Sequence, residues 1–186
     1  MASDEREIRL AWEHHLGRGR TSEAWLDAIL ARHREPQRHY HQLRHVAWML
    51  RHLTDLHADG HVDDLHCAVA AACFHDAIYD PLAAPGDNER ASAALANTAL
   101  VELEWDAAAT DHVVAMILAT IDHDIAATSD RDTLAVLAAD LAVLAAAPGP
   151  YGGYVRAVRR EYAHVDDEGW RTGRAAVLRQ LLDRDR

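Results

Sequence analysis

The sequence predicts an all-α, single-domain helical bundle of about eight or nine helices, and three observations support this. Strand signals are almost absent: no alternating β-branched or aromatic run is bounded by Asn-Gly or Asp-Gly, and Phe occurs once. Apolar residues recur instead at helical spacing between capping and breaking residues. A length of 186 residues with 49% hydrophobic residues suits one globular domain, residues 1–186, built around one core.

Three helices are expected in the first third of the chain. The first spans about residues 4–16 and ends at Gly17, because glycine readily adopts the left-handed conformation that terminates a helix. The second spans about residues 21–34. The third is expected over residues 36–56, since Pro36 in a first turn lacks only an N–H that would be unpaired there.

The middle of the chain predicts three further helices around one loop. A nearly uninterrupted apolar run indicates that the fourth helix, residues 62–75, is buried on most sides and central to the bundle. A loop rich in Pro and Gly follows at residues 80–87. Asn88 is expected to cap a fifth helix over residues 88–103, and a sixth is expected over residues 106–121.

The last third of the chain predicts three more helices. The seventh begins at Asp130 or Asp132 and is closed by Pro148. The last two, residues 151–165 and 168–182, are Arg-rich and amphipathic. Charged residues on these two helices are expected to form structural ion pairs, among them Arg159, Arg160, Glu161 and Arg174.

Composition excludes several classes of function. Nineteen basic against thirty acidic residues give a net charge of −11, which argues against a nucleic-acid partner. The apolar runs are too short to span a bilayer and the N-terminus lacks an apolar signal segment, so a cytoplasmic location with no membrane partner is expected. Cys67 and Cys73 lie in one apolar run, which favours two buried thiols over a disulfide.

Histidine is the unusual component, with fourteen residues. His41 and His45 are four apart on the expected third helix, so their rings would lie one turn apart on one face and could share a metal ion. A purely structural pair is equally open, because a chain rich in histidine produces this spacing by chance. The polar residues 38–41 beside the pair favour a site.

Polar groups interrupt two other apolar helices. His75 and Asp76 end one of them, and Asp140 is surrounded by apolar residues on another. Buried ionisable groups are costly unless they are paired, hydrogen-bonded or metal-bound. A hydrogen-bonded helix cap is the alternative for the His-Asp pair, and a salt bridge to an arginine is the alternative for Asp140. With His45 these residues offer two nitrogens and two oxygens, which suit Mn²⁺, Mg²⁺, Fe²⁺, Co²⁺ or Ni²⁺ and not a thiolate-bound structural zinc.

The order and spacing of these groups resemble the HD-domain superfamily of metal-dependent phosphohydrolases, which is named after its His-Asp pair. The resemblance covers nearly the whole chain and is to the small, stand-alone members of bacteria. It is carried by Arg38-His-Tyr40-His41-Gln-Leu-Arg-His45, Phe74-His75-Asp76-Ala-Ile-Tyr79-Asp80, Asn88-Glu89-Arg-Ala-Ser92, Ala139-Asp140-Leu141 and Tyr151 to Tyr162.

The resemblance implies a bundle of the HD-domain type and one divalent cofactor, which would be Mn, Mg, Fe, Co, Ni or Zn. The implied metal ligands are His45, His75, Asp76 and Asp140. A second ion is allowed, because some superfamily members bind one through two histidines between the His-Asp pair and the last Asp. That interval holds His112 and His123. We expect His123 at the substrate pocket and His112 on the surface.

Four more residues are candidates for catalysis or substrate binding. Asp80 and Glu89 would orient the attacking water or take its proton, and His41 would protonate the leaving group. Arg38 would contact a phosphate oxygen. The alternative for Glu89 is a first-turn charge favoured by the helix dipole, and the alternative for Arg38 is an internal ion pair.

The expected function is hydrolysis of a small phosphomonoester or nucleotide by metal-activated water. Two alternatives stay open: a metal- or ligand-binding sensor module without turnover, and a helical non-haem iron oxygenase. The expected partner is a small phosphorylated substrate. The oligomeric state is left open, with a homodimer as one option.

Overall fold

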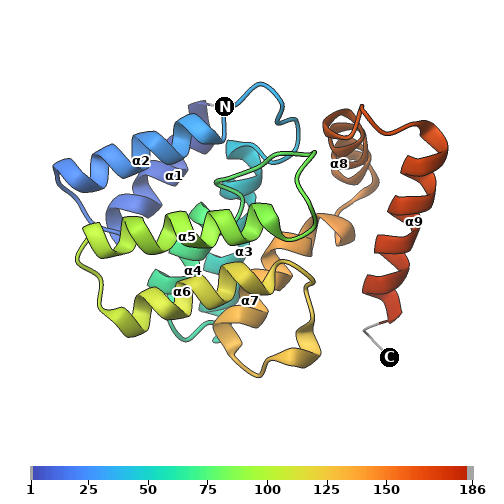
Figure 1. Ribbon diagram of the computed structural model, residues 1–186. Helices are drawn as coiled ribbons and strands as arrows, with labels where there is room; N and C mark the ends of the chain where they lie inside the picture. The colour runs from blue at the N-terminus through green and yellow to red at the C-terminus, as the bar shows by residue number, and fades with distance from the viewer. Residues whose placement is uncertain (1, 184–186) are drawn as a thin grey trace.

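The computed structural model describes residues 2–183, and over this range the all-α expectation is confirmed (Figure 1). Met1 and residues 184–186, the ends of the expected domain, lie outside the described residues. The elements are α1 (Ala2–His15), α2 (Arg20–Arg32), α3 (Leu43–Ala58), α4 (Leu65–Phe74), α5 (Asp87–Glu102), α6 (Ala107–Ala119), the 3-10 turn η1 (Ile125–Ala127), α7 (Arg131–Leu141), the 3-10 turn η2 (Ala142–Ala145), α8 (Pro148–Glu161) and α9 (Asp167–Asp183).

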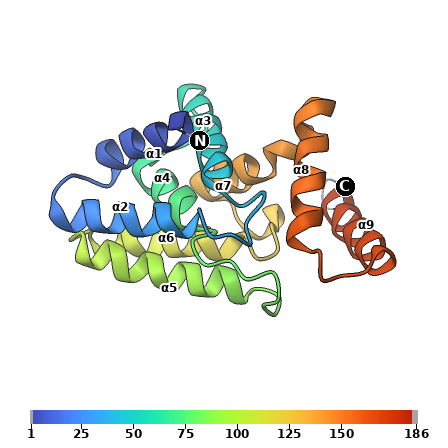
Figure 2. The same cartoon turned by 90° about the horizontal axis from the view of Figure 1, so that it is seen from above.

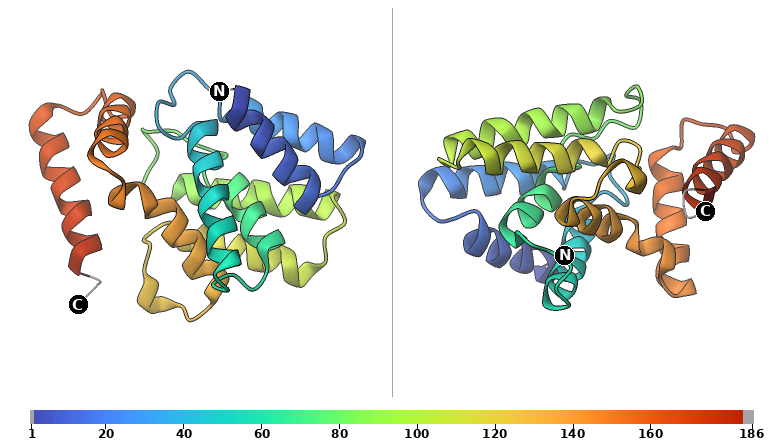
Figure 3. Two further views of the ribbon diagram at one scale, coloured as in Figure 1. Left: turned by 180° about the vertical axis from the view of Figure 1, so that it is seen from behind. Right: turned by 90° about the horizontal axis from the view of Figure 1, so that it is seen from below.

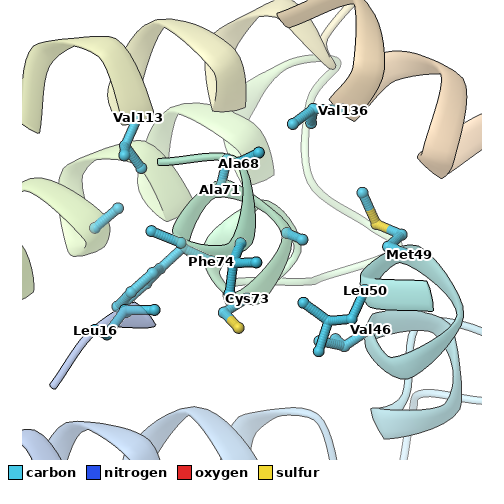
Figure 4. Packing of buried hydrophobic residues seen from close by; sticks show 14 of the residues in the cluster. Leu16, Val46, Met49, Leu50, Ala68, Ala71, Cys73, Phe74, Val113 and Val136 are labelled. Carbon is cyan, nitrogen blue, oxygen red and sulfur yellow. The ribbon is translucent and has the colours of Figure 1, made fainter. Parts of the chain in front are cut away.

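Helix α4 lies at the centre of the bundle, as its apolar sequence predicts. Every residue from Cys67 to Phe74 is buried, and the helix contacts α1, α3, α5, α6 and α7. Figure 4 shows Met49 and Leu50 of α3 on one side of α4 and Val113 of α6 on another. The alanines of α4 add little bulk, so the neighbouring helices can approach it closely. The two cysteines are free and buried, as expected.

The remaining helices surround α4 and leave one end of the bundle to α8 and α9. Helices α5 and α6 run side by side, α1 and α7 pack on α3, and α8 and α9 lie together beyond η2 (Figures 2 and 3). Among residues 2–183, no single helix is both long and apolar enough to cross a membrane. The segments 131–145 and 148–161 meet those criteria only as a pair bent by 103°.

The third helix begins at Leu43 and not at Pro36, so the expectation that His41 lies on it is wrong. The segment before Leu43 forms turns whose N–H groups are taken by a carboxylate from α8. Glu161 accepts hydrogen bonds from the backbone N–H groups of His39 (2.6 Å), Tyr40 (2.7 Å) and His41 (3.1 Å). Because the N–H groups of residues 39–41 bind the Glu161 carboxylate, the helix does not begin at Pro36, although the local sequence favours an earlier start.

Two other boundary predictions are wrong for similar reasons. Helix α5 follows Gly86, whose φ of 82° is left-handed, and Asn88 is not its cap. The Asn88 side chain instead accepts from the N–H of Asp80 and donates to its C=O, which fixes the loop before α5. Pro148 begins α8 and does not end α7. Proline is tolerated in a first turn because an N–H at that position would have no partner within the helix.

Candidate metal centre

The structure brings four of the predicted residues together from three helices. His45 comes from the start of α3, His75 and Asp76 follow the end of α4, and Asp140 lies on α7. The Nε2 atoms of the two histidines are 3.1 Å apart. Asp76 Oδ2 lies 2.9 Å from His75 Nε2, and Asp140 Oδ1 lies 3.1 Å from His45 Nε2. Both imidazoles are buried, and both carboxylates are mostly buried.

The orientation of the two rings suits a shared cation. His75 Nδ1 lies 3.0 Å from the carbonyl oxygen of Ala72, which can only accept, so Nδ1 keeps its proton and Nε2 is the nitrogen that can offer a lone pair to a metal once its own proton is displaced. His45 Nε2 faces the same point. Atoms that bind one ion at about 2.0–2.2 Å lie about 3–3.5 Å from one another. The ligand atoms of His45, His75 and Asp76 lie 2.9 to 3.6 Å from one another and so fit one divalent metal. Asp140 Oδ1 lies beside them, 3.1 Å from His45 Nε2 and 3.8 Å from His75 Nε2.

The charges of the cluster shift the pKa of its members in opposite directions. Burial alone would lower the pKa of His75, but the charge and hydrogen bond of Asp76, the charge of Asp140 and the hydrogen bond to Ala72 together outweigh burial and raise it to about 9. Burial alone would raise the pKa of Asp76 and of Asp140. Nearby His75 holds the first well below its usual range, and a hydrogen bond from His123 does so for the second. A cluster that keeps both carboxylates charged favours a cation at its centre.

Comparison of the chain with known proteins identifies no relative. No family model, curated protein or solved structure matches this chain. We therefore infer which metal ions the cluster could bind from its donor atoms alone. Two imidazoles and two carboxylates suit borderline and hard divalent ions. Neither cysteine belongs to the cluster among the described residues, and burial raises the pKa of the Cys73 thiol to about 12.

His123 lies beside the cluster and His112 lies away from it, as the sequence analysis expects for both. His123 Nε2 is 2.7 Å from Asp140 Oδ2, so this ring holds the carboxylate while the other oxygen faces His45. Its φ of 55° is left-handed, a strained conformation that tends to persist at functional positions. His112 Nε2 is 3.1 Å from Oδ2 of Asp130, the residue that caps α7, and His112 is not among the described residues that line the cavity beside the cluster.

The second group of metal-ligand types has a structural explanation. It comprises His112, Asp130 and Asp132. Asp130 caps α7 by accepting from the N–H and hydroxyl of Thr133, and Asp132 accepts from two backbone N–H groups, those of Asp63 and Asp64. The oxygens of this group therefore hold the start of α7 against the segment before α4.

His41 reaches the cluster from the loop before α3 and is held by a residue whose role the sequence did not predict. His41 Nδ1 lies 2.8 Å from Glu161 Oε2, and His41 Nε2 lies 3.9 Å from Asp76 Oδ2. Burial would lower the pKa of His41, but Asp76 and Glu161 outweigh it and raise that pKa. Glu161 also accepts from the Tyr79 hydroxyl at 3.0 Å. The sequence led us to expect an arginine as the partner of Glu161, and that expectation is wrong. The one sequence signal for a role at the site was that Glu161 lies within residues 151–162, a segment that carries the resemblance to the HD-domain superfamily.

The two candidate carboxylates separate in the structure. Glu89 lines the cavity beside the cluster, and burial, with the negative charge of Asp76, raises its pKa. Asp80 is exposed, caps the N–H of Leu82 and is not among the described residues that line the cavity. The structure thus brings Glu89 to the site and leaves Asp80 in the loop.

Arg38 does not face the cavity, so the expected phosphate contact is replaced by a structural one. Its side chain is fully buried and its guanidinium pairs with Glu35 at 3.1 Å. The other donors bind the carbonyl oxygens of His41, Asp76 and Ala77 at 3.1, 2.6 and 3.0 Å. Arg38 therefore ties the His41 loop to the segment that carries Asp76.

A cavity of about 630 Å³ opens beside the cluster, between it and α8 and α9. Asp140, His41, His123 and Glu89 line its inner wall. Its outer wall is aromatic and apolar and includes Tyr40, Tyr154, Tyr162, Trp170, Val177 and Leu181. Arg174 is the cation of this wall among the described lining residues. It donates to the Tyr154 hydroxyl and lies over that ring, so it does not form the expected ion pair.

Proposed function

We propose that the chain is a metal-dependent phosphohydrolase that acts on a small phosphomonoester or nucleotide. The observation that carries the proposal is the convergence of two imidazoles and two carboxylates beside a cavity that also contains acid and base candidates. The resemblance of the same residues to the HD-domain superfamily supports it. A sensor without turnover would not need Glu89 and His41 with raised pKa values at the same cavity.

The divalent ion would be held by the four residues of the cluster: His45, His75, Asp76 and Asp140. When bound, such an ion supplies polarisation of a phosphoryl oxygen and acidification of water. The chain contributes the positions of the ligands. The Ala72 carbonyl fixes the ring of His75, and His123 takes Oδ2 of Asp140 so that Oδ1 stays turned to His45.

Glu89 and His41 divide the acid and base roles in this proposal. Burial raises the pKa of Glu89, which makes its carboxylate a better proton acceptor for the attacking water. The raised pKa of His41 keeps more of its ring protonated near neutral pH, so it can donate to the leaving oxygen. Glu161 holds His41 in place through Nδ1, which leaves Nε2 on the side of Asp76.

The cavity favours a substrate with one phosphate and a flat or apolar organic part. A volume of about 630 Å³ lies within the range of small-ligand sites. Arg174 and His123 offer donors for phosphate oxygens, and the rings of Tyr154 and Trp170 offer faces for a base or another flat group.

The first prediction tests the metal and the reaction together. The purified chain is expected to bind one equivalent of Mn²⁺ and to release phosphate from part of a panel of nucleotides and sugar phosphates, with loss of both activities in Asp76→Ala. Asp111→Ala, which removes an exposed carboxylate of α6, is the control and should behave as wild type. Isothermal titration and a phosphate-release assay measure the two. A folded Asp76→Ala protein that still binds stoichiometric Mn²⁺ would contradict the ligand set, and metal binding without turnover of any ester would favour the sensor.

A further inference from the structure

A separate group of three histidines lies where the end of α1 meets the start of α4. His14 and His15 are the last two residues of α1, and His66 is the second residue of α4. The ring centroid of His15 lies 4.6 Å from that of His14 and 4.8 Å from that of His66, and the His14 and His66 rings stack at 6.3 Å. Most of α4, about 13.5 Å at 1.5 Å per residue, separates His66 from His75, so this group is distinct from the candidate metal centre.

Two nitrogens of this group face each other at the separation of two metal ligands. His15 Nδ1 lies 3.3 Å from His66 Nδ1, and atoms bound to one ion lie about 3–3.5 Å apart. His66 Nδ1 also lies 3.3 Å from the carbonyl oxygen of His15. Both distances exceed the usual N–H hydrogen-bond length of about 2.9–3.0 Å, so a proton between the rings is held loosely. Neither ring forms a hydrogen bond through Nε2 within the described part of the chain, so each can carry its proton there and present the Nδ1 lone pair to a cation.

Solvent reaches this group, and its middle ring is neutral. His14 and His66 are exposed and His15 is half-buried, so an ion can approach from outside. Burial, and after it the neighbouring His66, lowers the pKa of His15 to about 4, so His15 carries no positive charge at neutral pH. The Asp64 carboxylate acts on His15 in the opposite sense and contributes a negative charge beside the group. An unprotonated imidazole near a carboxylate is a suitable ligand for a cation.

The donor atoms of the group select transition metals. Imidazole suits Zn, Cu and Ni, whereas Mg and Ca prefer oxygen ligands, and Mn²⁺ binds a given site less strongly than Ni²⁺. Asp64 is not a ligand, because its two oxygens accept from the N–H of Cys67 at 3.0 Å and from its thiol at 3.3 Å. The group thus differs from the candidate metal centre, whose two carboxylates also suit harder ions.

We propose that His15 and His66 bind a divalent transition-metal ion, Ni²⁺, Cu²⁺ or Zn²⁺, through their Nδ1 atoms, with His14 as a third imidazole ligand. Water completes the coordination shell. The His14 side chain is exposed and forms no hydrogen bond within the described residues, so rotation about its side-chain bonds can bring a nitrogen to the ion. Because the ligands belong to α1 and α4, the ion joins the first helix to the central one and stabilises the folded chain.

Ni²⁺ titration of the full chain tests the site. In Asp76→Ala, which removes the proposed catalytic ion, isothermal titration should still show one equivalent of bound Ni²⁺ and no bound Mg²⁺. Adding His66→Asn should weaken Ni²⁺ binding at least about tenfold, because a ligand is lost. His164→Asn is the matched control, since His164 is exposed and contacts none of the three rings, and it should leave Ni²⁺ affinity unchanged. Equal Ni²⁺ affinity with and without His66 would overturn the proposal.

A second measurement uses the wild-type chain and identifies the ligand atoms. With ¹⁵N-labelled histidine, saturating Zn²⁺ should shift the Nδ1 signals of His15 and His66 and leave those of His164 in place. His14→Asn should weaken this Zn²⁺ binding about tenfold, and unchanged affinity would remove His14 from the ligand set. Absence of a shift at His15 and His66, or a shift that shows coordination through Nε2, would overturn the proposal. Because these rings are observed directly, the result does not depend on whether the candidate metal centre binds an ion or hydrolyses an ester.

Discussion

Glu161 links the last third of the chain to the candidate site. It is buried, and its two oxygens serve different partners: Oε1 accepts from backbone N–H groups of the segment before α3, and Oε2 lies next to His41 and the Tyr79 hydroxyl. One residue of α8 thus fixes both the loop and the ring proposed as the general acid. The sequence showed a Glu between arginines and so suggested an ion pair, since local charge does not reveal partners 120 residues away.

The second prediction is that Glu161→Gln destabilises the protein. The amide keeps the shape but replaces one accepting oxygen with an NH₂ group, so either the backbone donors or His41 and Tyr79 lose their acceptor. In the variant an NH₂ donor faces buried N–H or O–H donors that have lost their acceptor. This should lower the free energy of unfolding by about 2–4 kcal/mol. Urea denaturation measures it. Glu168→Gln, at an exposed position in the first turn of α9, is the control and should change stability by less than about 0.5 kcal/mol.

The third prediction concerns pH and the same carboxylate. Burial would raise the pKa of Glu161, but His41 and the backbone N–H groups of His39 and Tyr40 lower it to about 2. A carboxyl whose folded pKa is depressed stabilises the protein above its unfolded pKa and loses that contribution as the pH falls through the folded value. The stability gap between wild type and Glu161→Gln should therefore shrink as the pH falls from about 4.5 to 2, and it should also narrow as the pH rises above about 6.5, where His41 loses the proton that Glu161 helps it to hold. A gap that is independent of pH down to 2 would show that Glu161 is not ionised in the folded state.

At the scale of elements, long apolar helices could be predicted and their boundaries could not. The apolar run of α4 and the capping aspartates of α6 and α7 are local signals, and the helices follow them. Pro36 and Asn88 are also local signals, but at both positions hydrogen bonds to residues distant in the sequence determine where the helix begins. Glu161 captures the N–H groups after Pro36, and the Asp80 backbone captures the Asn88 side chain. The four cluster residues were predictable because each breaks an apolar pattern, and a pattern is visible without knowledge of the fold.

The fourth prediction follows from the burial of α4. Ala71 is fully buried at the centre of the bundle, so Ala71→Leu forces extra volume into a closely packed region. We expect a loss of about 1–3 kcal/mol and a melting temperature lower by about 3–10 °C. Because His75 and Asp76 directly follow α4, Mn²⁺ affinity should fall as well. Ala94→Leu on the exposed face of α5 is the control. Equal melting temperatures for the two variants would contradict the packing described for α4.

At the scale of the whole molecule, α8 and α9 line the cavity beside a candidate metal site whose proposed ligands all lie in the rest of the bundle. Tyr154 and Glu161 of α8 and Trp170 and Arg174 of α9 reach the cavity or the His41 loop. Their amphipathic sequences predicted helices but not where those helices pack, because an apolar stripe does not specify the surface that covers it. The candidate cluster joins α3, α7 and the segment after α4, and His41 connects it to Glu161 of α8. Metal binding should therefore stabilise the molecule as a unit.

The fifth prediction is that this stabilisation depends on pH. In the metal-free protein the neighbours of His75, Asp76 first among them, raise its pKa to about 9 despite burial, so a proton occupies His75 through neutral pH. This proton itself stabilises the fold below the unfolded pKa of about 6.5 and is lost as the pH rises through about 9. A metal must displace it, and each unit of falling pH then weakens binding about tenfold. Thermal melts with and without excess Mn²⁺ should show a rise in melting temperature that is large at pH 7.5 and small at pH 5. Asp76→Ala should show no rise at either pH, and equal rises for wild type at both pH values would mean that His75 is not a ligand.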